Sequence, residues 1–151
     1  MSGGQRPVPV PLPLAPFERE GLAAALAKAG LSTEDLDSET PLFWRFEDSD
    51  VSVPLGFGGL ELFGDQALMR SVVTLPPVRN RGIGADIVAL LETEARIRGA
   101  HTVWLSTDRA IEFFSRLGYR ACERSEAPRQ VQQTAAFVQP ATAQAMMKRL
   151  D

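Results

Sequence analysis

The sequence is poor in the side chains that build metal centres and disulfides. Its single cysteine, Cys122, excludes an internal disulfide and a multi-cysteine metal site. Its single histidine, His101, argues against a histidine-rich zinc site. A Ser-His-Asp triad would have to use His101, and no Gly-x-Ser-x-Gly turn accompanies it. We therefore expect a protein without a resident metal.

A large excess of one charge and long apolar runs are also lacking. The formal net charge is −3, so we expect no general attraction to nucleic acid. No apolar run reaches membrane-spanning length and no signal peptide is visible, which predicts a cytoplasmic protein without a membrane partner. The 151 residues, 44% of them apolar, suit one domain over residues 1–151, with residues 1–6 as a loose terminus.

Hydrophobic periodicity predicts strands interleaved with helices. Prolines at every second position from Pro7 to Pro13 fit either polyproline II or an edge strand with backbone donors on one edge only. The Gly64-Asp65 pair predicts a tight hairpin turn. Further strands are expected at 42–48, 54–64, 67–75, 101–107, 119–124 and 144–150, and helices at 16–29, 33–37, 83–98, 108–117 and 128–137.

The order of strand 67–75, helix 83–98 and strand 101–107 has the spacing of a right-handed crossover between parallel strands. The earlier strands are expected to be antiparallel neighbours. The predicted fold is therefore α/β (α+β), with a mixed, mostly antiparallel sheet of six to seven strands flanked by helices.

The stretch PPVRNRGIG, residues 76–84, lies between that first strand and the helix. A helix that begins near Ile83 exposes unpaired backbone N–H groups, and the glycines remove side chains that would keep a ligand away from them. Arg79 and Arg81 add positive charge for a polyphosphate. An anion cradle competes here with a plain loop that carries solvated arginines. A Walker loop is excluded, and Ile87 stands where a Rossmann fingerprint has its third glycine.

The pattern Arg79-x-x-Gly82-x-Gly84 resembles the acetyl-CoA signature of the GNAT N-acetyltransferase superfamily. The later IEFFSRLGY, residues 111–119, resembles the second helix of that family, which usually ends in Leu-Gly-Phe or Leu-Gly-Tyr. The core of the resemblance runs from about Leu55 to Gly118. It implies acetyl-CoA as co-substrate, with strands 67–75 and 101–107 splaying apart to form the cofactor cleft.

The resemblance also implies roles for individual residues. Backbone groups on strand 67–75 would pair with the pantetheine arm, and N–H groups from Asn80 through Ala85 would hold the pyrophosphate beside the two arginines. Thr107 stands where many relatives have an asparagine that contacts the pantetheine or the catalytic region. The candidate cofactor-binding residues are Val72, Val73, Thr74, Arg79, Asn80, Arg81, Gly82, Ile83, Gly84, Ala85 and Thr107.

A narrower resemblance concerns GLELFGDQALMRSVV and the downstream APRQVQQTAAFVQPATAQAMMKRL. Both are similar to the N-acetyltransferase branch associated with arsenic-resistance gene clusters. Sequences of that branch tend to have cysteine just before the late proline, where this chain has Gln139 before Pro140. The resemblance implies a resistance-related enzyme, whereas Gln139 in place of the cysteine argues against direct handling of arsenic.

An alkylamine must lose a proton before it can attack a thioester, and Glu61 is the candidate base. A two-residue turn would place Glu61 opposite Leu68, with Arg70 diagonally on the same face. A structural ion pair is the competing interpretation, and both can hold if Arg70 keeps Glu61 ionised. Arg70, which would also grip a substrate carboxylate, and Ser71 are the candidate substrate-binding residues.

The backbone N–H of Val73 is the candidate donor to the oxyanion of the reaction. Phe114 stands where the family usually has a tyrosine that protonates the leaving thiolate, so water, Ser71 or Thr107 would serve instead. The leading function is acetyl transfer from acetyl-CoA to a primary amine of a small molecule, by direct attack in a ternary complex. A non-catalytic acyl-CoA sensor and a peptide or protein N-acetyltransferase remain alternatives. The oligomeric state stays open between a monomer and a homodimer.

Overall fold

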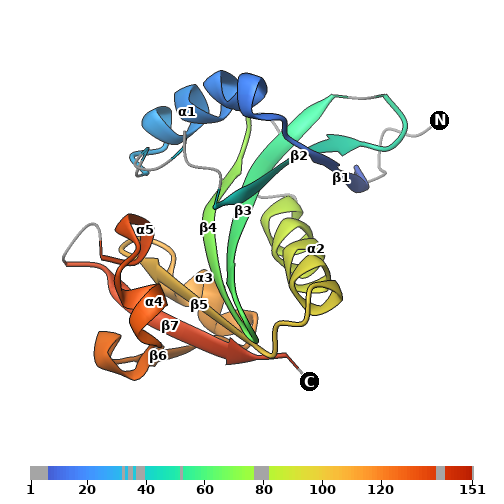
Figure 1. Ribbon diagram of the computed structural model, residues 1–151. Helices are drawn as coiled ribbons and strands as arrows, with labels where there is room; N and C mark the ends of the chain where they lie inside the picture. Colours follow the sequence, from blue (N-terminus) through green and yellow to red (C-terminus); the bar gives the residue numbers. More distant parts are fainter. Residues whose placement is uncertain are drawn as a thin grey trace.

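A computed structural model of the protein describes residues 7–31, 33, 36, 40–51, 53–76, 82–138 and 142–150. Seven strands form one sheet in the spatial order β1-β2-β3-β4-β5-β7-β6 (Figure 1). The strands are β1 (Pro9–Pro13), β2 (Leu42–Asp48), β3 (Pro54–Phe63), β4 (Gln66–Thr74), β5 (Thr102–Thr107), β6 (Arg120–Cys122) and β7 (Gln144–Arg149). The α-helices are α1 (Arg19–Lys28), α2 (Ile83–Ile97), α3 (Ile111–Arg116), α4 (Arg129–Gln132) and α5 (Ala135–Val138), and 3-10 turns lie at Pro16–Glu18 and Arg124–Glu126.

The sheet is mixed, as predicted. Its neighbouring strands are antiparallel except for β4 and β5, which are the two strands joined by the crossover through α2. The parallel pairing covers only Gln66–Leu68 against Thr102–Trp104. Beyond these residues β4 continues to Thr74 and β5 to Thr107 without pairing, so the two strands separate. The predicted splayed parallel pair is confirmed.

The β3–β4 hairpin has the register expected from its turn. Gly64, in the turn, has φ +63°, a left-handed value that glycine adopts at little cost. Glu61 pairs with Leu68, and Gly59 pairs with Arg70. Because a slip of one residue would exchange the two faces, this register fixes which side chains can meet across the hairpin.

A β-bulge in β4 was not predicted. Gly59 pairs with Arg70 and Phe57 pairs with Val73, so two residues of β4, Ser71 and Val72, lie opposite one residue of β3. Such an insertion bends the bulged strand and increases its twist. The bulge lies just beyond the segment of β4 that pairs with β5, where the bend contributes to the separation of the two strands.

The proline-rich segment at the start of the described chain forms an edge strand. The carbonyl oxygen of Val8 accepts a hydrogen bond from the Ser49 N–H at 3.0 Å, and the Leu14 N–H donates to the Phe43 carbonyl at 2.8 Å. The even-numbered residues therefore face β2, and the alternating prolines present no N–H at the outer edge. This outer edge is blocked against regular strand addition.

Helices cover both faces of the central strands. On one face, Ile87, Leu91 and Ala95 of α2 pack fully buried in the main core. On the other, Leu22 and Leu26 of α1 lie in a second cluster with side chains from β2, β3 and β4. Figure 1 shows α1 and α2 near the half of the sheet that contains β1 to β4, with α4 and α5 beside β7. In the described residues, no helix is both long and apolar enough to cross a membrane.

The helices expected at 128–137 and at 33–37 have different outcomes. The expected helix over 128–137 is two short helices, because a turn at Gln133 and Thr134 interrupts it. The expected helix at 33–37 falls largely outside the described residues. Glu92 in α2 is a buried carboxylate, with only 6% of the residue exposed. The Tyr119 hydroxyl donates to its carboxylate at 2.9 Å, and Lys148 covers it from β7.

Candidate active site

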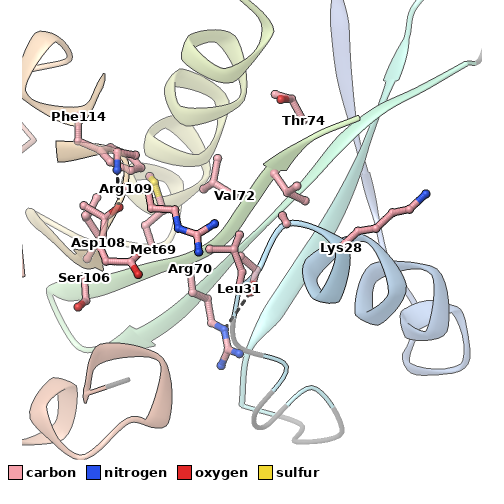
Figure 2. A pocket seen from close by; sticks show the side chains of 16 residues that line it. Lys28, Leu31, Met69, Arg70, Val72, Thr74, Ser106, Asp108, Arg109 and Phe114 are labelled. Carbon is pink, nitrogen blue, oxygen red and sulfur yellow. Dashed lines mark hydrogen bonds between the residues drawn. The ribbon is translucent and has the colours of Figure 1, made fainter. Parts of the chain in front are cut away.

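A cavity of about 660 Å³ lies where β4 and β5 separate. The end of α1 forms one wall, β4 a second, and the end of β5 with the following loop a third (Figure 2). It contains the bulge in β4 and both predicted substrate-binding residues, Arg70 and Ser71. The described residues that line it are Lys28, Ala29, Leu31, Met69, Arg70, Ser71, Val72, Val73, Thr74, Leu105, Ser106, Thr107, Asp108, Arg109, Ala110 and Phe114.

A second cavity, of about 560 Å³, lies at the start of α2. Val72 and Thr74 line both cavities, so the two spaces lie along the same stretch of β4. The remaining lining residues come from the first turn of α2 and from α3 and its end: Gly82, Gly84, Ala85, Phe113, Arg116 and Leu117. A ligand with a long arm and a charged end could therefore follow β4 from the bulge to the start of α2.

The first turn of α2 has the features of an anion site. Gly82, the residue before the helix, has φ +79°, and no side chain in the described structure caps the turn. The first intrahelical hydrogen bond is donated by the Asp86 N–H to the Gly82 carbonyl at 3.2 Å. The N–H groups of the residues before Asp86 therefore have no hydrogen-bond partner within the helix. Backbone N–H groups at this position favour a bound phosphate. The residues present here therefore fit a pyrophosphate.

Gly84 has a packing role that spacing alone did not indicate. A Cβ added there would lie 3.2 Å from Cζ of Phe113 and 3.7 Å from the Thr74 methyl carbon. Gly84 therefore lets the start of α2 approach α3 and β4 closely, and this approach shapes the second cavity. Ile83, the first residue of α2, is buried in the core and is not among the residues that line the second cavity. Arg79, Asn80 and Arg81 lie outside the described residues.

Two arginines that line the cavities were not predicted as site residues from the sequence. Arg116, exposed near the end of α3, lines the second cavity and adds a positive charge opposite the start of α2. Arg109, in the β5–α3 loop, lines the first cavity. Arg116 could have been found from periodicity, because it lies three residues after Phe113 on the same helical face. No local pattern signals the position of Arg109.

Ser71, in the bulge, is the only non-glycine residue of the described chain with a left-handed backbone, at φ +62°. Such a conformation costs on the order of 1–3 kcal/mol and concentrates at functional sites. The Ser71 hydroxyl accepts a hydrogen bond from Nε of Arg70 at 3.2 Å. The strained residue is thus tied to Arg70 at the wall of the larger cavity.

The direction of the backbone in β4 bears on the expected oxyanion donor. Val73 pairs with Phe57, and the Leu75 N–H donates to the Leu55 carbonyl at 2.9 Å. Backbone groups alternate between the two edges of a strand, so the Val73 N–H also faces β3. This direction argues against Val73 as the donor in the cleft. Val72, which falls within the bulge, is the better placed of the two.

Glu61 and Arg70 form a buried ion pair. Nη1 of Arg70 lies 3.2 Å from Oε2 of Glu61, and the two side chains are 3% and 8% exposed. The Arg70 guanidinium also lies 5.5 Å from the ring centroid of Phe43. Gly59 leaves room for this arrangement, because a Cβ there would lie 2.6 Å from Cδ1 of Phe43. Arg70 lines the larger cavity and Glu61 does not, so a path from Glu61 to a ligand leads past Arg70 or through water.

Phe114 and Thr107 lie on the opposite wall. The Phe114 ring is buried among Phe113 and Tyr119 in edge-to-face contacts with centroid distances of 5.0 and 5.5 Å. The Thr107 hydroxyl accepts a hydrogen bond from the Ala110 N–H at 3.1 Å, which closes the turn into α3. Thr107 therefore lines the cavity with a hydroxyl that the fold already holds in place.

Tyr119 lies away from both cavities. Burial, followed by the Glu92 carboxylate, raises the pKa of the Tyr119 phenol far above its usual range. The phenol therefore stays protonated and donates to Glu92. Lys148 contacts the same carboxylate at 3.0 Å and donates to the Leu117 carbonyl at 2.9 Å. This network joins α2 to the end of α3 and to β7.

Solved structures with similar folds include several bound to coenzyme A. The chain matches Rv2747 from Mycobacterium tuberculosis, solved in complex with CoA, with a TM-score of 0.76 and 21% identity over 95% of this chain and 100% of that one. It matches a putative acyl-CoA N-acyltransferase from Klebsiella pneumoniae with a TM-score of 0.74 and 25% identity, over 95% and 98% of the two chains. No curated protein matches the sequence.

N-acetylglutamate synthase from Neisseria gonorrhoeae, complexed with coenzyme A and L-arginine, gives a TM-score of 0.77 at 18% identity. The match covers 97% of this chain but 34% of the synthase, so the chain spans about a third of that enzyme's length. The family described as the acetyltransferase (GNAT) family matches residues 12–119, which is more than half of the chain. The chain belongs to the acetyltransferase (GNAT) family.

Proposed function

We propose that the protein transfers an acetyl group from acetyl-CoA to a primary amine of a small molecule, with both substrates bound together. One observation carries this proposal. Two cavities meet along Val72 and Thr74 of a bulged strand, between an uncapped helix start and a buried Arg70–Glu61 pair. One end of this space suits a diphosphate, and the other offers polar side chains to an acceptor.

Acetyl-CoA, when bound, supplies an activated acetyl thioester. We propose that the backbone N–H groups of Gly82 to Ala85 hold its pyrophosphate, with Arg116 adding charge from α3. The pantetheine arm of acetyl-CoA would lie along Val72 and Thr74, which line both cavities. The N–H groups at the bulge would then donate to the acetyl oxygen.

The acceptor would occupy the larger cavity. We propose Glu61 as the group that takes the proton of the amine through a water molecule, since Glu61 itself does not line the cavity. Nη1 of Arg70 lies 3.2 Å from Oε2 of Glu61, and the Ser71 hydroxyl accepts a hydrogen bond from Nε of Arg70. No tyrosine stands at Phe114, so the leaving thiolate would take its proton from water, Ser71 or Thr107.

Phe114 is also the observation that favours a second candidate function. A buried phenylalanine ring lines the cavity where a proton donor is usual in the family. A non-catalytic module that binds and senses acyl-CoA would need no such donor. Binding of the coenzyme is common to both functions, so only turnover separates them.

The similarity of GLELFGDQALMRSVV and the late segment to the arsenic-resistance branch leads us to propose a resistance-related acceptor. The charged and polar lining of the larger cavity suits a compact, amino-acid-like amine. We propose a cytoplasmic location, where acetyl-CoA is available, and one acetyltransferase domain over the chain.

The test is release of free coenzyme thiol from acetyl-CoA in the presence of a panel of amines. Amine-dependent release is expected, and Glu61→Gln should lower kcat by about 100-fold or more, as loss of a general base does. Glu20→Gln, at an exposed position of α1, is the control and should behave like the parent. Tight binding of acetyl-CoA without turnover of any amine would contradict catalysis and favour the sensor.

A further inference from the structure

We infer that the acceptor carries a carboxylate, or a group of the same charge, and that Arg109 binds it. The inference rests on the proposed function of the larger cavity and adds a chemical class of acceptor to it. Arg109 then determines specificity from the wall opposite to Arg70. An amine bearing an anionic group would lie between them, with the amine at the bulge and the anion at the mouth.

The charged lining of the larger cavity is the first observation. Among its described residues, Lys28, Arg70 and Arg109 carry positive charge, and Asp108 alone carries negative charge. Arg70 is already compensated by Glu61. Figure 2 shows the Lys28 amine directed away from Arg109. The guanidinium of Arg109 is therefore the cation that this space offers to a ligand.

The reach of Arg109 is the second observation. The residue lies in the β5–α3 loop, yet its Nη1 would be 3.2 Å from a Cβ added to Gly30, just beyond α1. Figure 2 shows the side chain extending from the loop toward Leu31. The guanidinium thus crosses the cavity from one wall to the other. A bound acceptor would have to lie beside it.

The surroundings of Arg109 leave its donors for a ligand. Within the described part of the chain, its guanidinium lies close to Gly30, just beyond the end of α1, and forms no hydrogen bond or ion pair. The carbonyl end of a helix attracts a positive charge, which helps hold the side chain across the cavity before a ligand arrives. A guanidinium has five N–H donors in a planar arrangement that matches a carboxylate.

The same charges disfavour other acceptors. A polyamine, or a lysine in a basic peptide, would bring positive charge next to Arg109, and like charges at short range repel. A neutral amine would leave the guanidinium without a charged partner. The cavity therefore favours acceptors whose net charge, apart from the reacting amine, is negative.

The test compares acids with esters of the same compounds, in which the negative charge is removed. Thiol release is measured with L-glutamate, L-methionine and 2-aminoethylphosphonate, each beside its neutral ester, and with spermidine. The parent should prefer at least one acid over its ester in kcat/KM. Arg109→Ala should lower this preference roughly tenfold, as expected for loss of one charge-assisted contact at an exposed residue, and Arg109→Lys should keep part of it. Arg129→Ala removes an exposed arginine outside both cavities and should change nothing.

The outcomes separate this inference from the transferase itself. Equal or better turnover of esters or of spermidine, or an unchanged preference in Arg109→Ala, would overturn the anion site while leaving the transferase intact. If no amine is acetylated, the proposed transferase function is contradicted. Calorimetry then tests the anion site separately. The N-acetyl form of each acid and of its ester would be titrated into protein loaded with coenzyme A. Tighter binding of an acid that Arg109→Ala weakens supports the anion site, and no difference overturns it.

Discussion

Removal of one member of the Arg70–Glu61 pair should destabilise the protein strongly. Both side chains are more than 90% buried, and their charged atoms lie 3.2 Å apart. Arg70→Met takes away the cation and leaves a buried carboxylate beside an apolar side chain. Breaking a buried pair in this way costs about 3–5 kcal/mol. At about 2–4 °C per kcal/mol for a chain of this size, the melting temperature should fall by roughly 6–20 °C.

A double-mutant cycle isolates the pair from other effects of each substitution. Glu61→Gln keeps the side-chain volume and an oxygen that can accept a hydrogen bond from Arg70. Its loss in free energy of unfolding should therefore be lower, about 1–2 kcal/mol. The double variant replaces both charged side chains, and should lose less stability than the sum of the single variants. Urea denaturation of the four proteins gives the coupling free energy, which we expect to exceed about 1 kcal/mol.

Activity measured on the same proteins assigns the role of Glu61. A structural role predicts that thiol release follows the fraction of folded protein in every variant. A role as proton acceptor predicts that folded Glu61→Gln loses kcat while its KM for acetyl-CoA is unchanged. A loss below 1 kcal/mol in Arg70→Met, or exact additivity in the double variant, would refute the reasoning from burial and distance.

Three smaller perturbations test other parts of the structure. Tyr119→Phe removes the hydroxyl that donates to Glu92 at 2.9 Å, and urea denaturation should show a loss of about 1–2 kcal/mol; no loss would contradict the network. Burial raises the pKa of the Cys122 thiol, so a thiol reagent should react slowly with native protein and fast in urea at pH 7. The pKa of Glu126 is lowered by the backbone N–H three residues earlier and then by Arg120. Its stabilising contribution is thus present above the ordinary glutamate pKa of about 4.3 and lost as pH falls through the lower folded value, so Glu126→Gln should flatten the acid limb of stability measured by denaturation.

The sequence predicted those parts of the fold that local patterns control. The Gly64-Asp65 turn determined the hairpin register and hence the meeting of Glu61 with Arg70. Alternating prolines predicted either an edge strand or polyproline II, and the hydrogen bonds to β2 show that the segment is an edge strand. The crossover predicted that β4 and β5 are parallel neighbours, since a parallel pair joined by a helix is a local unit of structure. Their separation was implied by the family resemblance.

Features that depend on contacts between distant elements were not predictable in the same way. The bulge at Ser71 arises from the pairing of β4 with β3, and no turn residue signals it. Glu92 occupies a helix position that resembles a solvated one, and only the approach of Tyr119 and Lys148 buries it. Arg109 reaches the larger cavity because the β5–α3 loop faces the end of α1. Arg79, Asn80 and Arg81 stay predictions, because they lie outside the described residues.

The central claim is that acetyl-CoA lies along β4 with its diphosphate at the start of α2. Thermal unfolding with and without acetyl-CoA tests it most directly, in the parent, in Gly84→Val and in Gly21→Val. Valine at position 84 would fill the space beside Phe113, whereas a Cβ at Gly21 meets nothing within 4 Å. At a ligand concentration of about 100 Kd, binding adds about 2.7 kcal/mol of stability. We expect that increment in the parent and in Gly21→Val and its loss in Gly84→Val; equal increments in all three proteins would contradict the account.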